Sequence, residues 1–232
     1  MNNHPKPQTK PRKTPLKSRK IQTQAVAGHA LSGSNAREGL AGRPVERRSV
    51  GLVAPKSPEF DVPVLGVDPG GRDTGIILVD GSRVAGCSVR SPGELLPVDQ
   101  GYIQAVLAEV GELIASTSGD VVVCVEGVTR PSWHVQASAS YGAAANPTGL
   151  IAAAVVLGAV LGAYPGAVVV PPGGNGSRPL GAYPAGLVSD GERRKSGWEL
   201  RVGGGKLRHQ RSAWDVAFKG HDLHVSQRVA KH

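Results

Sequence analysis

The 232-residue chain has few cysteines and no long apolar run. Its two cysteines, Cys87 and Cys124, fall within strand-like stretches and are too few for a disulfide framework, so we expect buried thiols in a reducing compartment. The most hydrophobic stretch, residues 149–162, has 14 residues, whereas a membrane span needs about 20. The polar, Lys-rich N-terminus lacks the apolar centre of a secretory signal. These absences predict a soluble cytoplasmic protein.

Most of the chain also lacks an excess of positive charge, although its net charge is +9. Residues 1–58 carry 12 Lys and Arg, two acidic residues and no Phe, Tyr or Trp, whereas the rest carries 15 basic and 16 acidic residues. Because the N-terminal segment cannot bury enough apolar area to offset chain entropy, we expect a disordered basic tail. Such a tail either contacts phosphates without sequence preference or only solubilises the chain. We expect one folded domain over residues 59–220 and a C-terminal tail over 221–232.

The stretch 64–80 contains the first candidate site residue. Its strand formers end at Asp68, and Pro69-Gly70-Gly71 then forces a turn before a second apolar run begins at Ile76. Asp68 is therefore expected at the end of a central strand, beside glycine backbone. A carboxylate there either caps the turn or binds a cation or phosphate.

A second carboxylate, Glu126, repeats this arrangement. It ends the apolar run Val121-Val-Val-Cys-Val-Glu126, which follows an amphipathic helix expected at residues 99–117 and is typical of a parallel strand covered on both faces. Carboxylates at the ends of neighbouring parallel strands converge, and a divalent metal would neutralise their repulsion. Further elements are expected at these ranges: strands 63–68, 74–80, 83–89 and 166–171, and a helix at 148–163.

Two polar segments and a late helix complete the pattern. Residues 129–147 interleave basic and aromatic side chains, which suits either nucleic-acid contact or a packed loop. Residues 172–208 are rich in Gly and contain Arg193-Arg194-Lys195, and we expect a mobile basic loop there. The helix expected at 208–218 spaces His209, Ser212 and Asp215 by three residues, so they share one broad face.

In this order, strand-Asp68-Pro-Gly, strand-Glu126 and a late helix with His209-x-x-Ser-Ala-x-Asp215, the chain resembles the RuvC-like resolvases. These are Holliday-junction endonucleases of the RNase H-like superfamily. The resemblance covers roughly residues 62–218 and is closest to versions in phages of actinobacteria, where a Leu-Arg-His-x-Arg-Ser-Ala-x-Asp-Val-Ala pattern recurs. It implies an α/β fold with a five-stranded mixed sheet flanked by helices, and host cytoplasm if the chain is phage-encoded.

The resemblance also implies roles for individual residues. Asp68 corresponds to the carboxylate of the first strand and Glu126 to that of the fourth. In the late helix, His209 stands where bacterial relatives have an Asp or His. Three residues later the helix departs from the bacterial pattern, because Ser212 stands where those relatives have an aspartate. Asp215, one turn further along, is then expected to complete the metal site, with His209 in support. Whether His209, Ser212 or Asp215 completes it stays open at this point.

The chemistry implied by the resemblance is phosphodiester hydrolysis with two divalent ions about 4 Å apart. Mg²⁺ suits hard oxygen ligands, and Mn²⁺ is expected to substitute. The predicted metal ligands are Asp68, Glu126 and Asp215, with His209 as a further catalytic residue. Family members cut branched DNA as homodimers, and the helix at 148–163 is the expected interface. Basic residues are predicted to contact DNA: Arg130, Arg193, Arg194, Lys195, Lys206, Arg208 and Arg211.

Two other functions compete with this hypothesis. A DNA-binding module without catalysis is favoured by Ser212, and argued against by Asp68, Glu126 and Asp215 together. An ATPase of the actin and sugar-kinase superfamily would explain the turn after Asp68. It needs two domains and a second phosphate-binding turn, and the sequence has room for only one such domain.

Overall fold

A computed structural model of the protein describes residues 45–48, 60–128 and 147–230, with backbone alone for 45–48. All of them belong to one compact unit, Leu40–His232. The strands are β1 (Val45–Arg48), β2 (Val64–Asp68), β3 (Asp73–Asp80), β4 (Arg83–Arg90), β5 (Val122–Glu126) and β6 (Val168–Val170). The helices are α1 (Gln100–Ala115), α2 (Pro147–Ala163), α3 (Asp190–Arg193) and α4 (Arg208–Val229).

The strands form one mixed sheet in the order β1-β4-β3-β2-β5-β6. Strand β3 is antiparallel to β2 and β4, whereas β2, β5 and β6 run parallel. The five strands β2–β6 and their flanking helices confirm the expected α/β fold with a five-stranded mixed sheet. β1 is an addition, pairing antiparallel with β4 at the edge of the sheet. It lies within residues 1–58; the rest of that predicted tail lies outside the described residues.

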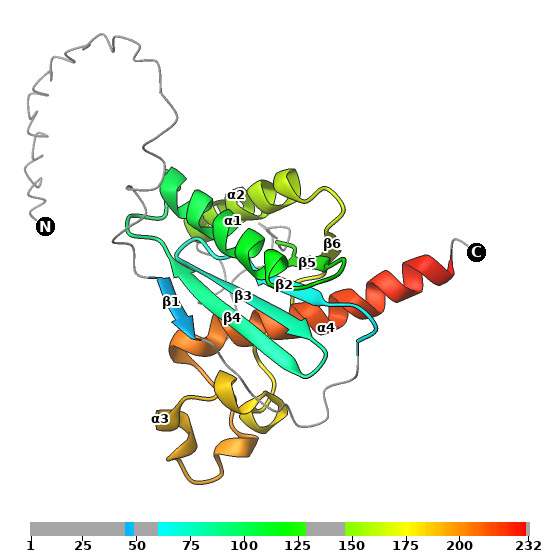
Figure 1. The fold of residues 1–232 in the computed structure, drawn as a ribbon. Coiled ribbons are helices and arrows are strands. Elements are labelled where there is room, and N and C mark those ends of the chain that lie inside the picture. The colour runs from blue at the N-terminus through cyan, green and yellow to red at the C-terminus, as the bar shows by residue number, and fades with distance from the viewer. Residues whose placement is uncertain (1–44, 49–59, 129–146, 231–232) are drawn as a thin grey trace, which may run out of the picture. The chain divides into compact units, whose positions relative to one another are not determined.

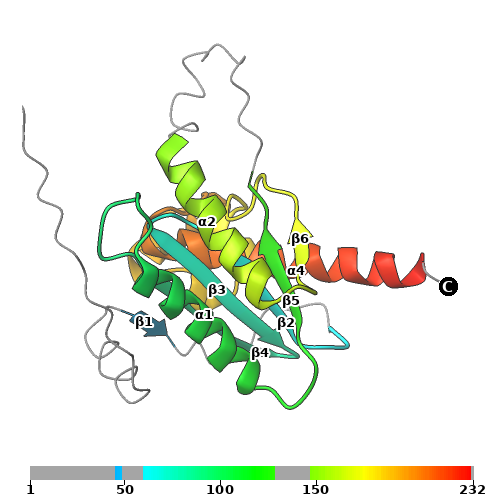
Figure 2. The same ribbon diagram turned by 90° about the horizontal axis from the view of Figure 1, so that it is seen from above.

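Helices cover the two faces of the sheet separately, as Figures 1 and 2 show. Helices α1 and α2 pack on one face against alternate strand residues such as Leu65, Ile76 and Val125. Helix α4 packs on the other face, where Trp214, Ala213 and Val216 meet the opposite set of strand residues. This alternation has period two, so Asp68 and Glu126 must emerge on the face that carries α4.

Glycine at two strand positions allows α4 to lie directly on the sheet. A Cβ at Gly66 of β2 would stand 2.0 Å from the carbonyl oxygen of Ala213, and one at Gly75 of β3 would stand 2.1 Å from that of His209. No side chain fits in these spaces. The close approach therefore fixes the N-terminal half of α4 above the end of β2, where the candidate site lies.

Two parts of the structure differ from expectation. Helix α4 continues to Val229, where a separate tail was expected from residue 221, because His221 packs on Phe60 with ring centroids 4.4 Å apart. Helix α2 is buried on one side and exposes Ile151 and Val155 on the other, and its role as an interface with a second copy stays a prediction. None of the described helices has the length and hydrophobicity needed to cross a bilayer.

The second difference concerns residues 172–208, which were expected to form a mobile basic loop. Of these, Arg208 begins α4, and the segment between β6 and α4 is residues 171–207. The structure shows a folded segment made of α3 and short 3₁₀ helices: η2 (Leu180–Ala182), η3 (Ala185–Leu187), η4 (Trp198–Leu200) and η5 (Gly205–Leu207). Leu180, Tyr183 and Leu187 are buried against the α4 side of the core. The sequence prediction missed this fold because the segment is rich in glycine and its buried apolar residues are widely spaced.

Replacing Gly66 by Ala tests the contact between α4 and β2. Because the new methyl group would overlap the α4 backbone, we expect the free energy of unfolding to fall by about 1–3 kcal/mol or more. The measurement is urea unfolding followed by tryptophan fluorescence. Gly111→Ala in α1 is the control, since its nearest atom would be at 3.7 Å, and it should stabilise the helix slightly. Equal stability of the two variants would contradict the account.

Candidate active site

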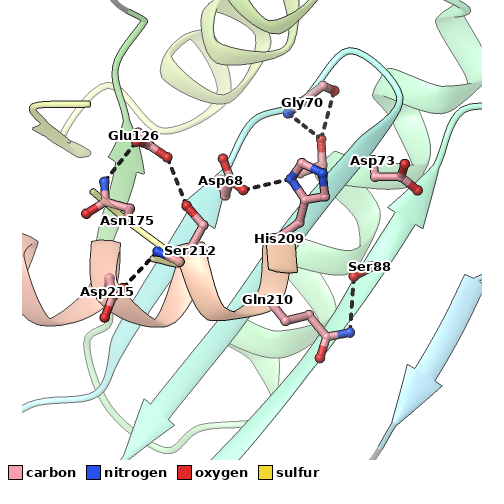
Figure 3. Close-up of polar contacts among 12 residues, drawn as sticks. Asp68, Gly70, Asp73, Ser88, Glu126, Asn175, His209, Gln210, Ser212 and Asp215 are labelled. Atoms are coloured by element: carbon pink, nitrogen blue, oxygen red, sulfur yellow. Dashed lines mark hydrogen bonds and ion pairs between the residues drawn. The ribbon is translucent and has the colours of Figure 1, made fainter. Parts of the chain in front are cut away.

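Asp68 and Glu126 end the neighbouring parallel strands β2 and β5 and lie on the same face of the sheet (Figure 3). Val67 of β2 pairs with Val125 of β5, so Asp68 and Glu126 are the next residues on the two strands. The expectation that these two carboxylates converge is therefore met by the geometry. The side chain of Asp68 is 15 % exposed, so the pair lies at the edge of the core and not within it.

His209, in the first turn of α4, contacts Asp68 directly. Its Nδ1 lies 2.8 Å from Oδ2 of Asp68. An ionised carboxylate only accepts hydrogen bonds, so Nδ1 carries the proton and a neutral imidazole keeps its lone pair on Nε2. Burial lowers the pKa of His209, but the hydrogen bond and the charge of Asp68 outweigh it, and the net direction is upward.

Glu126 is held by two neutral donors. The hydroxyl of Ser212 donates to Oε2 at 3.1 Å, and the amide of Asn175 donates to Oε1 at 2.8 Å. Burial, together with the nearby charge of Asp68, raises the pKa of Glu126. A raised carboxylate pKa beside a second carboxylate is the electrostatic pattern of a functional site.

The turn after Asp68 is fixed by hydrogen bonds from the α1 side of the sheet. Tyr102 of α1 donates its hydroxyl to the carbonyl of Gly70 at 2.7 Å and shares a hydrogen bond of the same length with Thr74. Both side chains are buried. The glycine turn that the sequence indicated is thus rigidly anchored, and it holds the end of β2 in place.

Asp215 does not join this pair, which corrects the prediction that it is a metal ligand. It is 3 % exposed and accepts hydrogen bonds from the backbone N–H of Gly176 and the hydroxyl of Tyr183, each at 2.8 Å. Arg178 forms an ion pair with its other oxygen at 3.2 Å. Three-residue spacing turns the direction of a side chain by about 60° per step, so Asp215 points about 120° away from His209.

Arg211 is also not where the sequence predicted it. It was expected to contact DNA, but it is fully buried and donates to the carbonyls of Leu187 and Gly204 at 2.8 Å. Its guanidinium forms an ion pair with Glu192 at 3.2 Å. Arg211 therefore holds the segment 171–207 against α4, and no phosphate can reach it.

The other basic residues predicted to contact DNA divide into two groups. Five are exposed around the start of α4 and on the segment that precedes it: Arg193, Arg194, Lys195, Lys206 and Arg208. Their role in DNA contact stays a prediction. Arg130 lies outside the described residues. The sequence prediction did not include Asn175, because its Gly-Gly-Asn-Gly context indicated only a loop. It named Ser212 as a departure from a family pattern and as one of three residues that could complete the metal site.

The chemistry of the site can be tested against the expected Mg²⁺. The described residues contain no group of three or more His, Cys, Asp or Glu side chains that could hold a metal ion. Mg²⁺ is, however, often held by one or two carboxylates together with substrate phosphates and water. Asp68 and Glu126 meet that smaller requirement, and their mutual repulsion is what a divalent cation would neutralise.

Comparison with known proteins shows a structural likeness but no match in sequence. No protein-family model and no curated protein matches the chain. A solved structure of T. thermophilus RuvC in complex with a Holliday junction substrate is similar over 71 % of this chain and 96 % of that chain, with 17 % identity and a TM-score of 0.41. A likeness at this level carries no argument about function, and the fold class rests on the strand order described above.

Replacing the buried Arg211 by Met should destabilise the protein. Removing one partner of a buried ion pair leaves Glu192 without its countercharge and the carbonyls of Leu187 and Gly204 without the donors that Arg211 supplies. We therefore expect a loss of about 3–5 kcal/mol in the free energy of unfolding. Urea unfolding measures it. Arg208→Met makes the same change at an exposed position and should cost less than about 0.5 kcal/mol. A stable Arg211→Met protein with weakened DNA binding would restore the original prediction.

Replacing Glu126 by Gln should stabilise the protein at pH 7 without divalent ions, by roughly 0.5–2 kcal/mol. The folded state raises the pKa of Glu126, so ionisation costs stability as the pH rises through that pKa. The gain should vanish at a pH low enough to protonate Glu126 in both states. Unfolding at several pH values checks this, and a variant less stable at pH 7 than at low pH, relative to wild type, would contradict it.

Proposed function

We propose that this chain is a metal-dependent endonuclease that hydrolyses phosphodiester bonds in branched DNA, with the four-way junction as its substrate. The observation that carries the proposal is the pairing of β2 with β5, which places Asp68 and Glu126 side by side with His209 on Asp68. Hard carboxylate oxygens beside an imidazole suit a divalent cation and a phosphate. The family resemblance in the sequence supports the same activity.

Asp68 and Glu126 would hold Mg²⁺ or Mn²⁺, with His209 adjacent. The resemblance implies two divalent ions. When bound, they would activate the attacking water and stabilise the leaving 3′ oxygen. The hydrogen bond to Asp68 orients His209 so that Nε2 is the nitrogen able to take up or release a proton. Ser212 and Asn175 keep Glu126 in one orientation. Asp215 is not part of this proposal.

The surroundings of the site suit a DNA backbone. Arg208 begins α4 one residue before His209 and is exposed, and the 193–195 cluster is exposed on the folded segment that packs against the same helix. Basic side chains near a phosphate-cleaving centre position the duplex arms without recognising sequence. A folded segment holds these charges in fixed places, which favours a particular branch geometry over linear DNA.

A second copy of the chain would allow two symmetric strands to be cut. The exposed side of α2 carries Ile151 and Val155, which are 52 % and 41 % exposed, in a helix without charged residues. Pairing of this face with the same face of a second copy would bury it. We include a homodimer through α2 in the proposal for this reason.

The test is cleavage of a labelled four-way junction and its matched linear duplex, with Mg²⁺ or EDTA. We expect symmetric nicking of the junction alone, absent with EDTA. Asp68→Asn should lower the cleavage rate by about 10³-fold or more, because several kcal/mol of charge stabilisation depends on this ligand. Asp80→Asn is the matched control. Asp80 lies at the end of β3 that is far from Asp68, so this variant should cleave normally.

The outcomes separate the competing functions. Junction binding without cleavage in any divalent metal would leave a branched-DNA-binding module. ATP hydrolysis without DNA cleavage would favour the ATPase hypothesis. Full activity of Asp68→Asn would contradict the assignment of the site itself.

A further inference from the structure

The turn formed by residues 173–178 lies directly against α4 beside Glu126. Gly173, Gly174 and Gly176 all have positive φ values, of 128°, 71° and 72°. A Cβ at Gly176 would stand 3.1 Å from the backbone nitrogen of Ser212, so only glycine combines this conformation with this close approach. The backbone of the turn is therefore pressed against the helix residue that also contacts Glu126.

Asp215 anchors this turn from α4. The hydrogen bond from Gly176, the hydrogen bond from Tyr183 and the ion pair with Arg178 all come from residues 176–183. Burial and, secondly, the Asp215 carboxylate raise the pKa of Tyr183 to about 12, so its hydroxyl stays a donor at neutral pH. Asp215, which the sequence suggested as a metal ligand, thus holds Gly176, the residue after Asn175, in a fixed position.

Asn175 lies between two groups of opposite charge. On one side its amide nitrogen donates to Oε1 of Glu126, and on the other its oxygen accepts from the ammonium of Lys219. Lys219 also donates to the carbonyl of Gly173 at 3.2 Å. An ammonium group can only donate and a carboxylate can only accept, so these neighbours leave a single orientation for the amide. Asn175 is 8 % exposed.

From this geometry we propose that Asn175 is a positioning residue for Glu126. Lys219 orients its side-chain amide, and the turn that Asp215 anchors holds its backbone in place. The inference deepens the proposed function, since Glu126 is one of its metal ligands. Ser212 and Asn175 together occupy both oxygens of Glu126 with neutral donors. The carboxylate is thereby oriented beside Asp68, although among the residues that the structure describes no third carboxylate completes a metal-binding group there. Partners of this kind tune a ligand and typically change metal affinity 10–100-fold.

Two measurements on the full-length chain test the proposal. In metal-free protein, ¹⁵N NMR should show one side-chain amide pair, absent from Asn175→Ala, that exchanges slowly with water. Its shifts should change in Glu126→Gln and in Lys219→Met but much less in Lys219→Arg, which keeps a donor. Calorimetric titration with Mn²⁺ should show affinity reduced about tenfold or more in Asn175→Ala.

Gln210→Ala is the matched control. It removes a different buried side-chain amide, which lies on α4 and donates to Ser88 at 3.1 Å, so it should cost stability while Mn²⁺ affinity changes less than twofold. A shift in the Asn175 amide pair on changing Glu126 and Lys219 supports the positioning role even if wild-type protein cleaves no DNA. An amide pair unmoved by both changes overturns it, even if the protein proves to be a nuclease, as does equal Mn²⁺ affinity in Asn175→Ala and wild type.

Discussion

The parallel pairing of β2 with β5 is the constraint on which the candidate site depends. It sets the carboxyl ends of two buried strands at the same edge of the sheet, and the two-residue period of a strand puts Asp68 and Glu126 on the same face. The cost of this placement is electrostatic: burial, with the charge of Asp68, raises the pKa of Glu126. The pair is held in spite of that cost because apolar strands and the anchored turn at Gly70 leave it no alternative position.

Helix α4 serves different parts of the molecule from different sides. His209 and Ser212 face the carboxylates, Trp214 and Ala217 pack on the sheet, and the buried charges Arg211 and Asp215 hold the segment 171–207. Its close contact with Gly66 makes these placements rigid. A single helix thus couples the position of the site to that of the segment carrying the exposed basic cluster.

Much of the fold could be predicted from the sequence, because strand and helix periodicities are strong in residues 63–126. The ends of β2 and β5 also indicated Asp68 and Glu126 as candidates, since an acidic residue followed by Pro-Gly at Asp68 and by Gly at Glu126 interrupts an apolar run. The prediction failed for Asp215 and Arg211, whose roles depend on which side of α4 each residue faces. A shared broad face was inferred from three-residue spacing, but the 60° rotation at each step carries Asp215 away. Asn175 could not be identified at all, because its partners Glu126 and Lys219 are distant in sequence.

Anomalous diffraction from crystals of the protein grown with Mn²⁺ and a four-way junction tests the central claim most directly. The account predicts a Mn²⁺ peak bonded to Asp68 and Glu126, with a DNA phosphate on its open side and Asp215 still hydrogen-bonded to Gly176. A peak bonded to Asp215, or a junction bound with no Mn²⁺ between the two strand ends, would contradict it.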